Sequence, residues 1–182
     1  NGGAVELAYN NNIKLATTST GIDVTGISVS DGMSTNTLGT SNFVAGVNAG
    51  NSIASGGNYN VVVGDEAGTA ITTGDYNVAV GFDAGSELTT GSENILIGGK
   101  AGDALTTASG NLAIGRASLT SDTLGSASTA IGFQTLQNQN FTSATSTYNV
   151  AVGYQAGSVV TTGVENTLIG GLAGDAITTA VG

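Results

Sequence analysis

Acidic side chains are the first residues here that could do chemistry, and the repeats contain one adjacent pair, Asp65 and Glu66. A glycan-cleaving enzyme needs two carboxylates about 5 to 9.5 Å apart, one with a raised pKa. Neighbouring side chains in a strand usually point apart. The chain also has no His and no Cys, so the usual general base near neutral pH is missing. We predict no catalytic residues and no enzyme activity, with glycan depolymerisation as a remote alternative.

A second candidate is the phrase GGKAGDAL at 98–105, which returns as GGLAGDAI at 170–177. It is similar to the calcium-binding nonapeptide G-G-x-G-x-D, in which consecutive short turns cage the ion. Here the fourth position is Ala101 or Ala173, and two copies 72 residues apart cannot build that cage. Calcium would use Asp103 and Asp175, but we predict no metal site and no cofactor.

Threonine pairs are a third candidate, at 72/73, 89/90, 106/107, 161/162 and 178/179. An outward ladder of threonines is typical of ice-binding solenoids, whose surface has to be flat and unbroken. Here the register fails at Thr123-Leu124 and at an insertion. Adjacent side chains of a strand also point to opposite faces, so only one of each pair is available. We expect β-branched packing, with ice binding as another remote alternative.

The charge of the chain excludes several partners. Of 182 residues only Lys14, Lys100 and Arg116 are basic, against 13 acidic ones, giving a net charge of −10. Phosphate binding needs clustered Lys or Arg, so we predict no nucleic-acid partner and no docking on anionic membranes. No apolar run approaches the roughly 20 residues of a membrane-spanning helix. A start without Met and an end inside a repeat lead us to expect a segment of a longer chain.

An internal repeat positions all of these residues. Glycines that close NVAVG-like blocks recur at 64, 81, 98, 115, 132, 153 and 170, with gaps of 17, 17, 17, 17, 21 and 17, after an earlier one at 46. They mark about eight copies of N-[VIL]-x-[VI]-G-x-x-A-G-x-x-[ILV]-T-T-G-x-x, with a four-residue insertion near 137–146. A fixed period of this kind indicates stacked structural units.

Hydrophobic residues within each unit alternate with a period of two, which predicts strands. Residues 77–81 form the predicted first strand and 88–90 a weaker second one, with glycine corners at 81, 85 and 91. Two strands and two turns make one coil of a parallel β-solenoid, rising about 4.8 Å. We predict an all-β chain with a β-rich N-terminal segment over 1–40, and a β-solenoid, or β-roll, of about eight 17-residue coils over 41–182. The N-terminal segment has an Asn-rich turn at 10–12 and alternation at Ile22, Val24 and Ile27.

Both faces of the first strand are apolar, and we assign one face to the interior of the coil. This core ladder comprises Val61, Val63, Val78, Val80, Ile95, Ile97, Leu112, Ile114, Ile131, Val150, Val152 and Ile169. The opposite face holds Val62, Ala79, Leu96, Ala113, Ala130, Ala151 and Leu168. A strand with two apolar faces is buried on both, whereas a coil has one interior. We therefore expect the second face to pack against other copies of the chain. The alternative, an unassociated solenoid, leaves an alanine-rich surface exposed.

An asparagine begins the first strand of most coils, with Ser128 in one slot. These asparagines are Asn60, Asn77, Asn94, Asn111, Asn149 and Asn166. Amide side chains in stacked strands hydrogen-bond from layer to layer. We predict a structural Asn ladder, with sugar binding by these amides as the alternative. Tyr59, Tyr76 and Tyr148 precede the asparagines and are expected to pack the corner.

Two families share these phrases. Blocks 111–115 (NLAIG) and 128–132 (STAIG) resemble the N-S-V-A-I-G head repeat of trimeric autotransporter adhesins, although that family has a shorter coil without the A-G and T-T-G corners. The NVAVGYQAG…TTG…NTLIGG unit and the earlier phrase VELAYNNNIKLATTSTGIDVTG resemble tail-fibre proteins of marine bacteriophages, including cyanophage-type fibres. The resemblance implies left-handed coils, a homotrimer and a role in host attachment.

These expectations combine into one functional hypothesis, a rigid shaft segment of a virion tail fibre, located on the virion surface or otherwise extracellular. The head domain of a bacterial trimeric surface adhesin is the alternative. The expected partners are further copies of the chain and, as receptor, a host-surface glycan or protein. Residues 76–110 and 148–182 are identical at 26 of 35 positions. Phe82-Asp83 changes to Tyr154-Gln155 between them, so we expect these residues to face outward, where a partner can select them.

Overall fold

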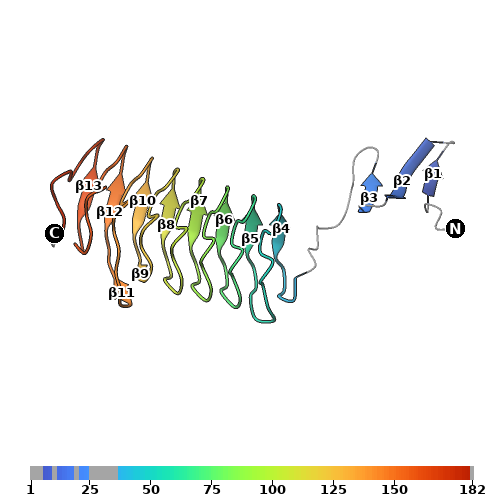
Figure 1. The fold of residues 1–182 in the computed structure, drawn as a ribbon, viewed down its shortest axis with the longest axis horizontal. Helices are drawn as coiled ribbons and strands as arrows, with labels where there is room; N and C mark the ends of the chain where they lie inside the picture. Colours follow the sequence, from blue (N-terminus) through green and yellow to red (C-terminus); the bar gives the residue numbers. More distant parts are fainter. Residues whose placement is uncertain (1–5, 10–11, 19–20, 25–36, 181–182) are drawn as a thin grey trace. The chain divides into compact units, whose positions relative to one another are not determined.

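A computed structural model describes residues 6–9, 12–18, 21–24 and 37–180, and within them the chain forms strands and turns but no helix (Figure 1). The all-β prediction is confirmed. The chain divides into two compact units, Asn1–Met33 and Ser34–Gly182. This division falls seven residues before the start of the solenoid predicted at 41.

The first unit contains a three-stranded antiparallel sheet. Its strands are β1 (Glu6–Tyr9), β2 (Asn12–Thr18) and β3 (Gly21–Val24), with β2 in the centre. Tyr9 pairs with Asn12 across the predicted Asn-rich turn, so short strands around this turn are confirmed. Ile27, the last residue of the predicted alternation, lies outside the described residues.

The second unit is a parallel β-solenoid with one three-residue strand per coil in a single eight-stranded sheet (Figure 1). The strands are β4 (Phe43–Ala45), β5 (Val61–Val63), β6 (Val78–Val80), β7 (Ile95–Ile97), β8 (Leu112–Ile114), β10 (Thr129–Ile131), β12 (Val150–Val152) and β13 (Thr167–Ile169). They stack in chain order and in register, so that Val62 lies opposite Ala79, which lies opposite Leu96. The eight strands enclose seven full turns, where the repeat predicts about eight coils.

Backbone hydrogen bonds join each coil to its neighbours. The Val61 N–H donates to the Asn77 carbonyl at 2.8 Å, and the Gly81 N–H donates to the Val63 carbonyl at 2.8 Å. Such bonds continue outside the sheet, since Thr72 N–H donates to Thr89 O at 2.9 Å. Each turn is therefore fixed to the next on more than one side, which makes the stack stiff.

The predicted second strand at 88–90 is wrong, because this segment is not a strand although its backbone bonds to the next coil. A second pair of strands exists at the insertion, where β9 (Gly125–Ser126) pairs in parallel with β11 (Thr145–Ser146). In Figure 1 the loop that carries β11 reaches further from the main sheet than the loop that carries β9. The extra residues thus lengthen one side of one coil and leave the main sheet in register.

The interior of the coils is lined by the face predicted to mediate oligomerisation, so the predicted assignment of the two strand faces is wrong. The residues of the assumed oligomer face are all buried: Val62, Ala79, Leu96, Ala113, Ala130 and Ala151 at 0% and Leu168 at 8% exposure. They pack against Ile71, Leu88, Leu105, Leu119, Leu136 and Val160 from the other wall of the coil. The assumed core ladder points outward, with Ile95 40% and Ile169 71% exposed.

Space and polarity explain the reversal. Asn77 and Ala79 are two residues apart and therefore share a strand face, and the buried amide brings the alanine inside with it. A 17-residue coil is also narrow, so that one large side chain such as Leu88 leaves room for only a small one opposite. Leu96 fits because the residues at the neighbouring corners are glycines. A Cβ on Gly85 would lie only 2.7 Å from Cδ1 of Leu96.

The Asn ladder is confirmed, and all six of its members are buried. The Asn77 N–H donates to Oδ1 of Asn60 at 2.9 Å, and its side-chain amide donates to the Gly91 carbonyl at 2.9 Å. Each asparagine therefore joins its coil to a neighbouring coil and also bonds to a carbonyl near the other end of its own coil. A buried polar group that keeps its hydrogen bonds costs little, so these amides are structural.

Candidate interaction surface

The outward side of the main sheet carries two columns of side chains, which we call the outer strand face. The first column is Phe43, Val61, Val78, Ile95, Leu112, Thr129, Val150 and Thr167, and the second is Ala45, Val63, Val80, Ile97, Ile114, Ile131, Val152 and Ile169. Every position is intermediate or exposed, and none is charged. Seven steps of about 4.8 Å make this face about 34 Å long. A large, mostly apolar strip on a surface is typical of an interaction site.

Aromatic residues border this face on both sides, and the sequence reasoning missed them as surface features. Tyr59, Tyr76 and Tyr148 lie just before the strands and are 50%, 57% and 59% exposed. The rings of Tyr59 and Tyr76 stack with centroids 4.9 Å apart and an interplanar angle of 9°. The prediction that these tyrosines pack the corner is thus wrong for their rings, which face solvent. A 17-residue spacing between aromatic residues is the signal that could have revealed the column.

The second border lies one residue beyond the glycine that follows each strand. Phe82, Phe133 and Tyr154 occupy it and are 53%, 37% and 56% exposed. Phe133 and Tyr154 stack at 5.6 Å with an interplanar angle of 5°, and the Arg116 guanidinium lies 5.9 Å from the centroid of Phe133. We call this position, which occurs once in each coil and holds Gly99, Arg116 and Gly171 in other coils, the second aromatic column. The rings of Phe133 and Tyr154 stack from one coil to the next.

Four acidic residues, Glu66, Asp83, Glu87 and Asp103, line a shallow groove of about 430 Å³ together with Lys100 and other residues. Lys100 Nζ lies 3.6 Å from Asp83 Oδ2 with about half of its side chain exposed, so this pair adds little stability. Among the described residues no three Asp or Glu side chains could hold a metal ion together. Asp103 instead accepts a hydrogen bond from Thr120.

The adjacent carboxylates Asp65 and Glu66 do not form a pair that faces one site. Glu66 has a positive φ of 58°, and its carboxylate accepts a hydrogen bond from the Asn48 amide at 2.7 Å. Asp65 is exposed. Glu66 lines the groove described above, whereas Asp65 is not among the residues that line it.

The threonine pairs divide their roles between the two residues. The first hydroxyl donates to a carbonyl of the next coil, as Thr89 does to Thr106 O at 3.0 Å, and the second threonine is exposed, as Thr90 is. The exposed threonines therefore form one column, which Leu124 interrupts. A single broken column is not the flat array that ice binding requires.

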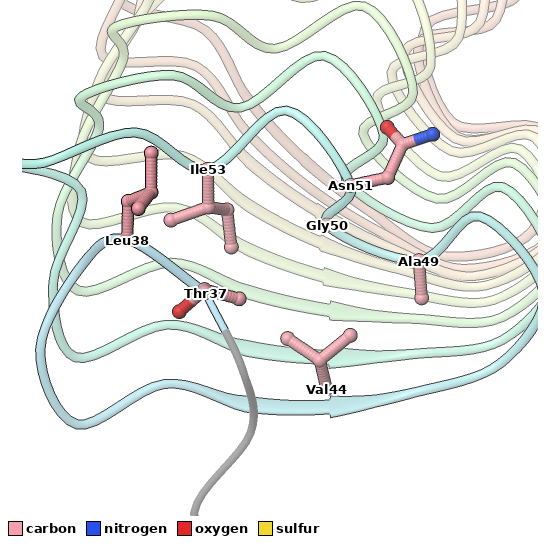
Figure 2. Close-up of a pocket in the computed structure, with 7 residues that line it drawn as sticks. All are labelled: Thr37, Leu38, Val44, Ala49, Gly50, Asn51 and Ile53. Atoms are coloured by element: carbon pink, nitrogen blue, oxygen red, sulfur yellow. The ribbon is translucent and has the colours of Figure 1, made fainter. Parts of the chain in front are cut away.

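Figure 2 shows a pocket of about 420 Å³ at the first coil, lined by Thr37, Leu38, Val44, Ala49, Gly50, Asn51 and Ile53. Val44 occupies the inward position of β4, opposite Val62 of the next coil, and is half-buried. In the coils from β5 to β12 this position has a paired strand on both sides. The pocket therefore lies at the β4 end of the stacked core, and the described residues that line it include no charged side chain.

A buried polar network replaces the Asn ladder at the insertion, where Ser128 stands in the asparagine slot. Asp122 accepts hydrogen bonds from the Gly125 and Phe141 N–H groups at 3.0 and 3.1 Å, and from Gln139 Nε2 at 2.6 Å. Gln139 Nε2 also donates to Ser128 at 2.8 Å, and its Oε1 accepts from Asn149 at 2.8 Å. Through Gln139, the network connects Ser128 with Asn149, the next asparagine of the ladder.

The fold and this surface place the chain in the class of parallel β-solenoid repeat proteins. No family model, curated protein or solved structure matches it in the comparisons. Among the described residues, no helix is long and apolar enough to cross a membrane.

Proposed function

We propose that the chain is a rigid, self-associating shaft segment of a virion tail fibre used in host attachment, at the virion surface or otherwise outside the cell. The observation that carries the proposal is the outer strand face, which keeps two uncharged, mostly apolar columns over eight strands. Burial of apolar side chains contributes about 25 cal/mol per Å² removed from water. A surface maintained in this way through every coil is best explained by a partner of equal length.

The partner that fits best is the same face of further copies. The net charge of −10 is carried by residues outside the outer strand face, so copies can meet there without bringing like charges together. A face only two side chains wide can contact two neighbours at once around a three-fold axis. This width is compatible with a homotrimer, the assembly implied by the resemblance to tail fibres and trimeric adhesins. The same resemblance implies left-handed coils. The adhesin head remains the alternative, because it uses the same assembly.

The stiffness of the stack supports a mechanical role. Backbone bonds, the Asn ladder and the threonine hydroxyls all run from coil to coil. A solenoid of this kind extends by adding coils, which suits a shaft that holds an attachment site away from a particle.

Sedimentation equilibrium of the chain tests the proposal. We expect the mass of three chains at micromolar concentration, and dissociation into folded single chains for the double variant Ile95→Asp and Ile114→Asp. The matched control, Thr90→Asp and Thr107→Asp, adds the same charges on the exposed threonine column and should leave the trimer intact. A folded monomer for the unmodified chain would overturn the proposal.

A further inference from the structure

Two glycines in the second aromatic column have no structural reason to be glycine. Gly99 and Gly171 follow Phe82 and Tyr154 by one coil, in the phrases GGK and GGL. Neither has a positive φ. A Cβ on Gly99 would meet only the Phe82 carbonyl oxygen, at 3.8 Å, and one on Gly171 only that of Tyr154, at 3.9 Å. A side chain therefore fits at both positions, yet both lack one.

What the two glycines share is the aromatic ring of the preceding coil. The Lys100 N–H donates to Phe82 O at 2.8 Å, and the Leu172 N–H donates to Tyr154 O at 2.8 Å, so each glycine lies directly beside its aromatic residue in the stack. Where a neighbouring residue in the column has a side chain, it can lie against the ring, as Tyr154 and Arg116 lie against Phe133. The glycines place no side chain beside Phe82 and Tyr154 in the following coil, and these residues are 53% and 56% exposed.

We infer that these exposed rings bind a neutral saccharide, with one pyranose ring stacked on Phe82 above Gly99 and another on Tyr154 above Gly171. This names the receptor chemistry for the attachment role and rests on that proposed function. The space beside Gly99, which we call the first slot, lies between the coil of Phe82 and the coil of Arg116; the corresponding space beside Gly171 is the second slot. The coils of Phe82 and Arg116 are two rises apart, or about 9.6 Å. A ring held by two contacts of about 3.5–4 Å needs about 7–8 Å, so one ring fits.

The rim of the first slot favours a saccharide over a purely apolar ring. Asp83 and Lys100, the residues that follow Phe82 and Gly99, form an ion pair at 3.6 Å. Hydroxyl groups can accept hydrogen bonds from the Lys100 ammonium and donate to the Asp83 carboxylate, whereas an apolar ring would desolvate these charges without compensation. A pyranose presents C–H groups to an aromatic face and hydroxyls at its edge.

The negative charge of the chain favours neutral sugars over acidic sugars as ligands. The chain carries −10 overall, and Glu66, Asp83 and Asp103 lie in the groove beside the first slot. Carboxylated or sulfated glycans would be repelled. The duplicated blocks keep the aromatic residue and the glycine while the rim changes from Asp83 and Lys100 to Gln155 and Leu172. The second slot should therefore bind the same class of ring with fewer polar contacts.

Saturation-transfer NMR on the full chain tests this inference, with glucose, galactose, mannose and N-acetylglucosamine and their neutral hexasaccharides as probes. We expect transfer to at least one probe, strongest at ring C–H protons, and an affinity reduced at least tenfold by Gly99→Leu with Gly171→Leu, which places a side chain beside each aromatic residue. Phe82→Ala with Tyr154→Ala should have the same effect. Tyr59→Ala with Tyr76→Ala removes exposed rings from the other border and should change affinity less than twofold.

Two results would overturn the inference: no transfer to any probe, or equal binding by the glycine variants. Circular dichroism of each variant establishes that it is folded, and sedimentation of the same samples reports the oligomeric state separately. A trimer that binds no saccharide contradicts only the slot, whereas a monomer that binds one contradicts only the proposed shaft assembly.

Discussion

The side-chain amide of Asn77 lies 2.9 Å from the carbonyl oxygen of Gly91, fourteen residues along the chain in the same coil. The same bond recurs between Asn94 and Ala108 at 2.9 Å and between Asn111 and Gly125 at 3.0 Å. It fixes the length of each coil, because the amide can reach that carbonyl only when the intervening turns are complete. The period of 17 is thus tied to a specific polar contact.

Replacing Asn94 by Ala should lower the free energy of unfolding by about 1–3 kcal/mol, because the Ala108 carbonyl and the Asn111 N–H lose their buried partner. Chemical denaturation followed by circular dichroism measures the change. Asn138→Ala is the control, since this asparagine is exposed, and should shift the unfolding free energy by less than about 0.5 kcal/mol. Equal effects would show that the ladder contributes nothing to stability.

Leu96 lies on the inward face of β7 and Ile97 on its outward face, so substitutions at these two residues test the assignment of the faces. Leu96→Ala should cost about 2–5 kcal/mol in unfolding free energy, because it leaves a cavity in the coil interior. Ile97 is 37% exposed, so Ile97→Ala should have a smaller effect on the fold and weaken association instead. Denaturation and sedimentation of both variants measure the two quantities. The account fails here if Ile97→Ala is the more destabilising of the two in the unassociated chain.

Two glycines on adjacent coils should respond in opposite ways to alanine. Gly81 has a φ of 131°, and a Cβ there would lie 2.7 Å from the Gly98 carbonyl carbon, so Gly81→Ala should prevent the close stacking of coils. Gly99→Ala is compatible with its backbone and should be neutral or stabilise the chain by about 0.4–1 kcal/mol. Thermal unfolding of the two variants provides the comparison. A loss of stability in Gly99→Ala as large as in Gly81→Ala would contradict it.

The buried pair Asp122 and Gln139 offers a double-variant test of the network at the insertion. Asp122→Asn places one amide against another, and should cost about 1–3 kcal/mol. Adding Gln139→Glu restores a donor and acceptor pair and should recover part of the loss, because the new carboxylate can accept from both residue 122 and Asn149. Denaturation of the single and double variants measures the coupling. Strictly additive losses would mean that the two side chains act independently.

The sequence was sufficient to predict the solenoid, because its period is fixed by residues that every coil needs: the asparagine, the glycine corners and the alternating strand. It did not lead us to the correct strand face. The buried amide of Asn77 had already determined which side of β6 is inside, since Ala79 shares its face. In a narrow coil the small residues belong inside.

The aromatic columns and the network around Asp122 could not be predicted from the sequence of a single coil. Their contacts depend on which residue occupies the same slot in the next coil, such as Tyr154 above Phe133 or Gly99 above Phe82. Aligning the repeats by slot could have placed the columns. The Asp122 network could not be found in this way, because the insertion changes the chain path through which Gln139 reaches Ser128.

The most direct test of the central claim is cross-linking through a single cysteine, since the chain has none of its own. Ile97→Cys places a thiol on the outer strand face, and Thr90→Cys places one on the exposed threonine column. A short bis-maleimide should join Ile97→Cys chains into covalent dimers at micromolar concentration and leave Thr90→Cys chains single. Equal cross-linking of the two, or cross-linking of Thr90→Cys alone, would contradict assembly through the outer strand face.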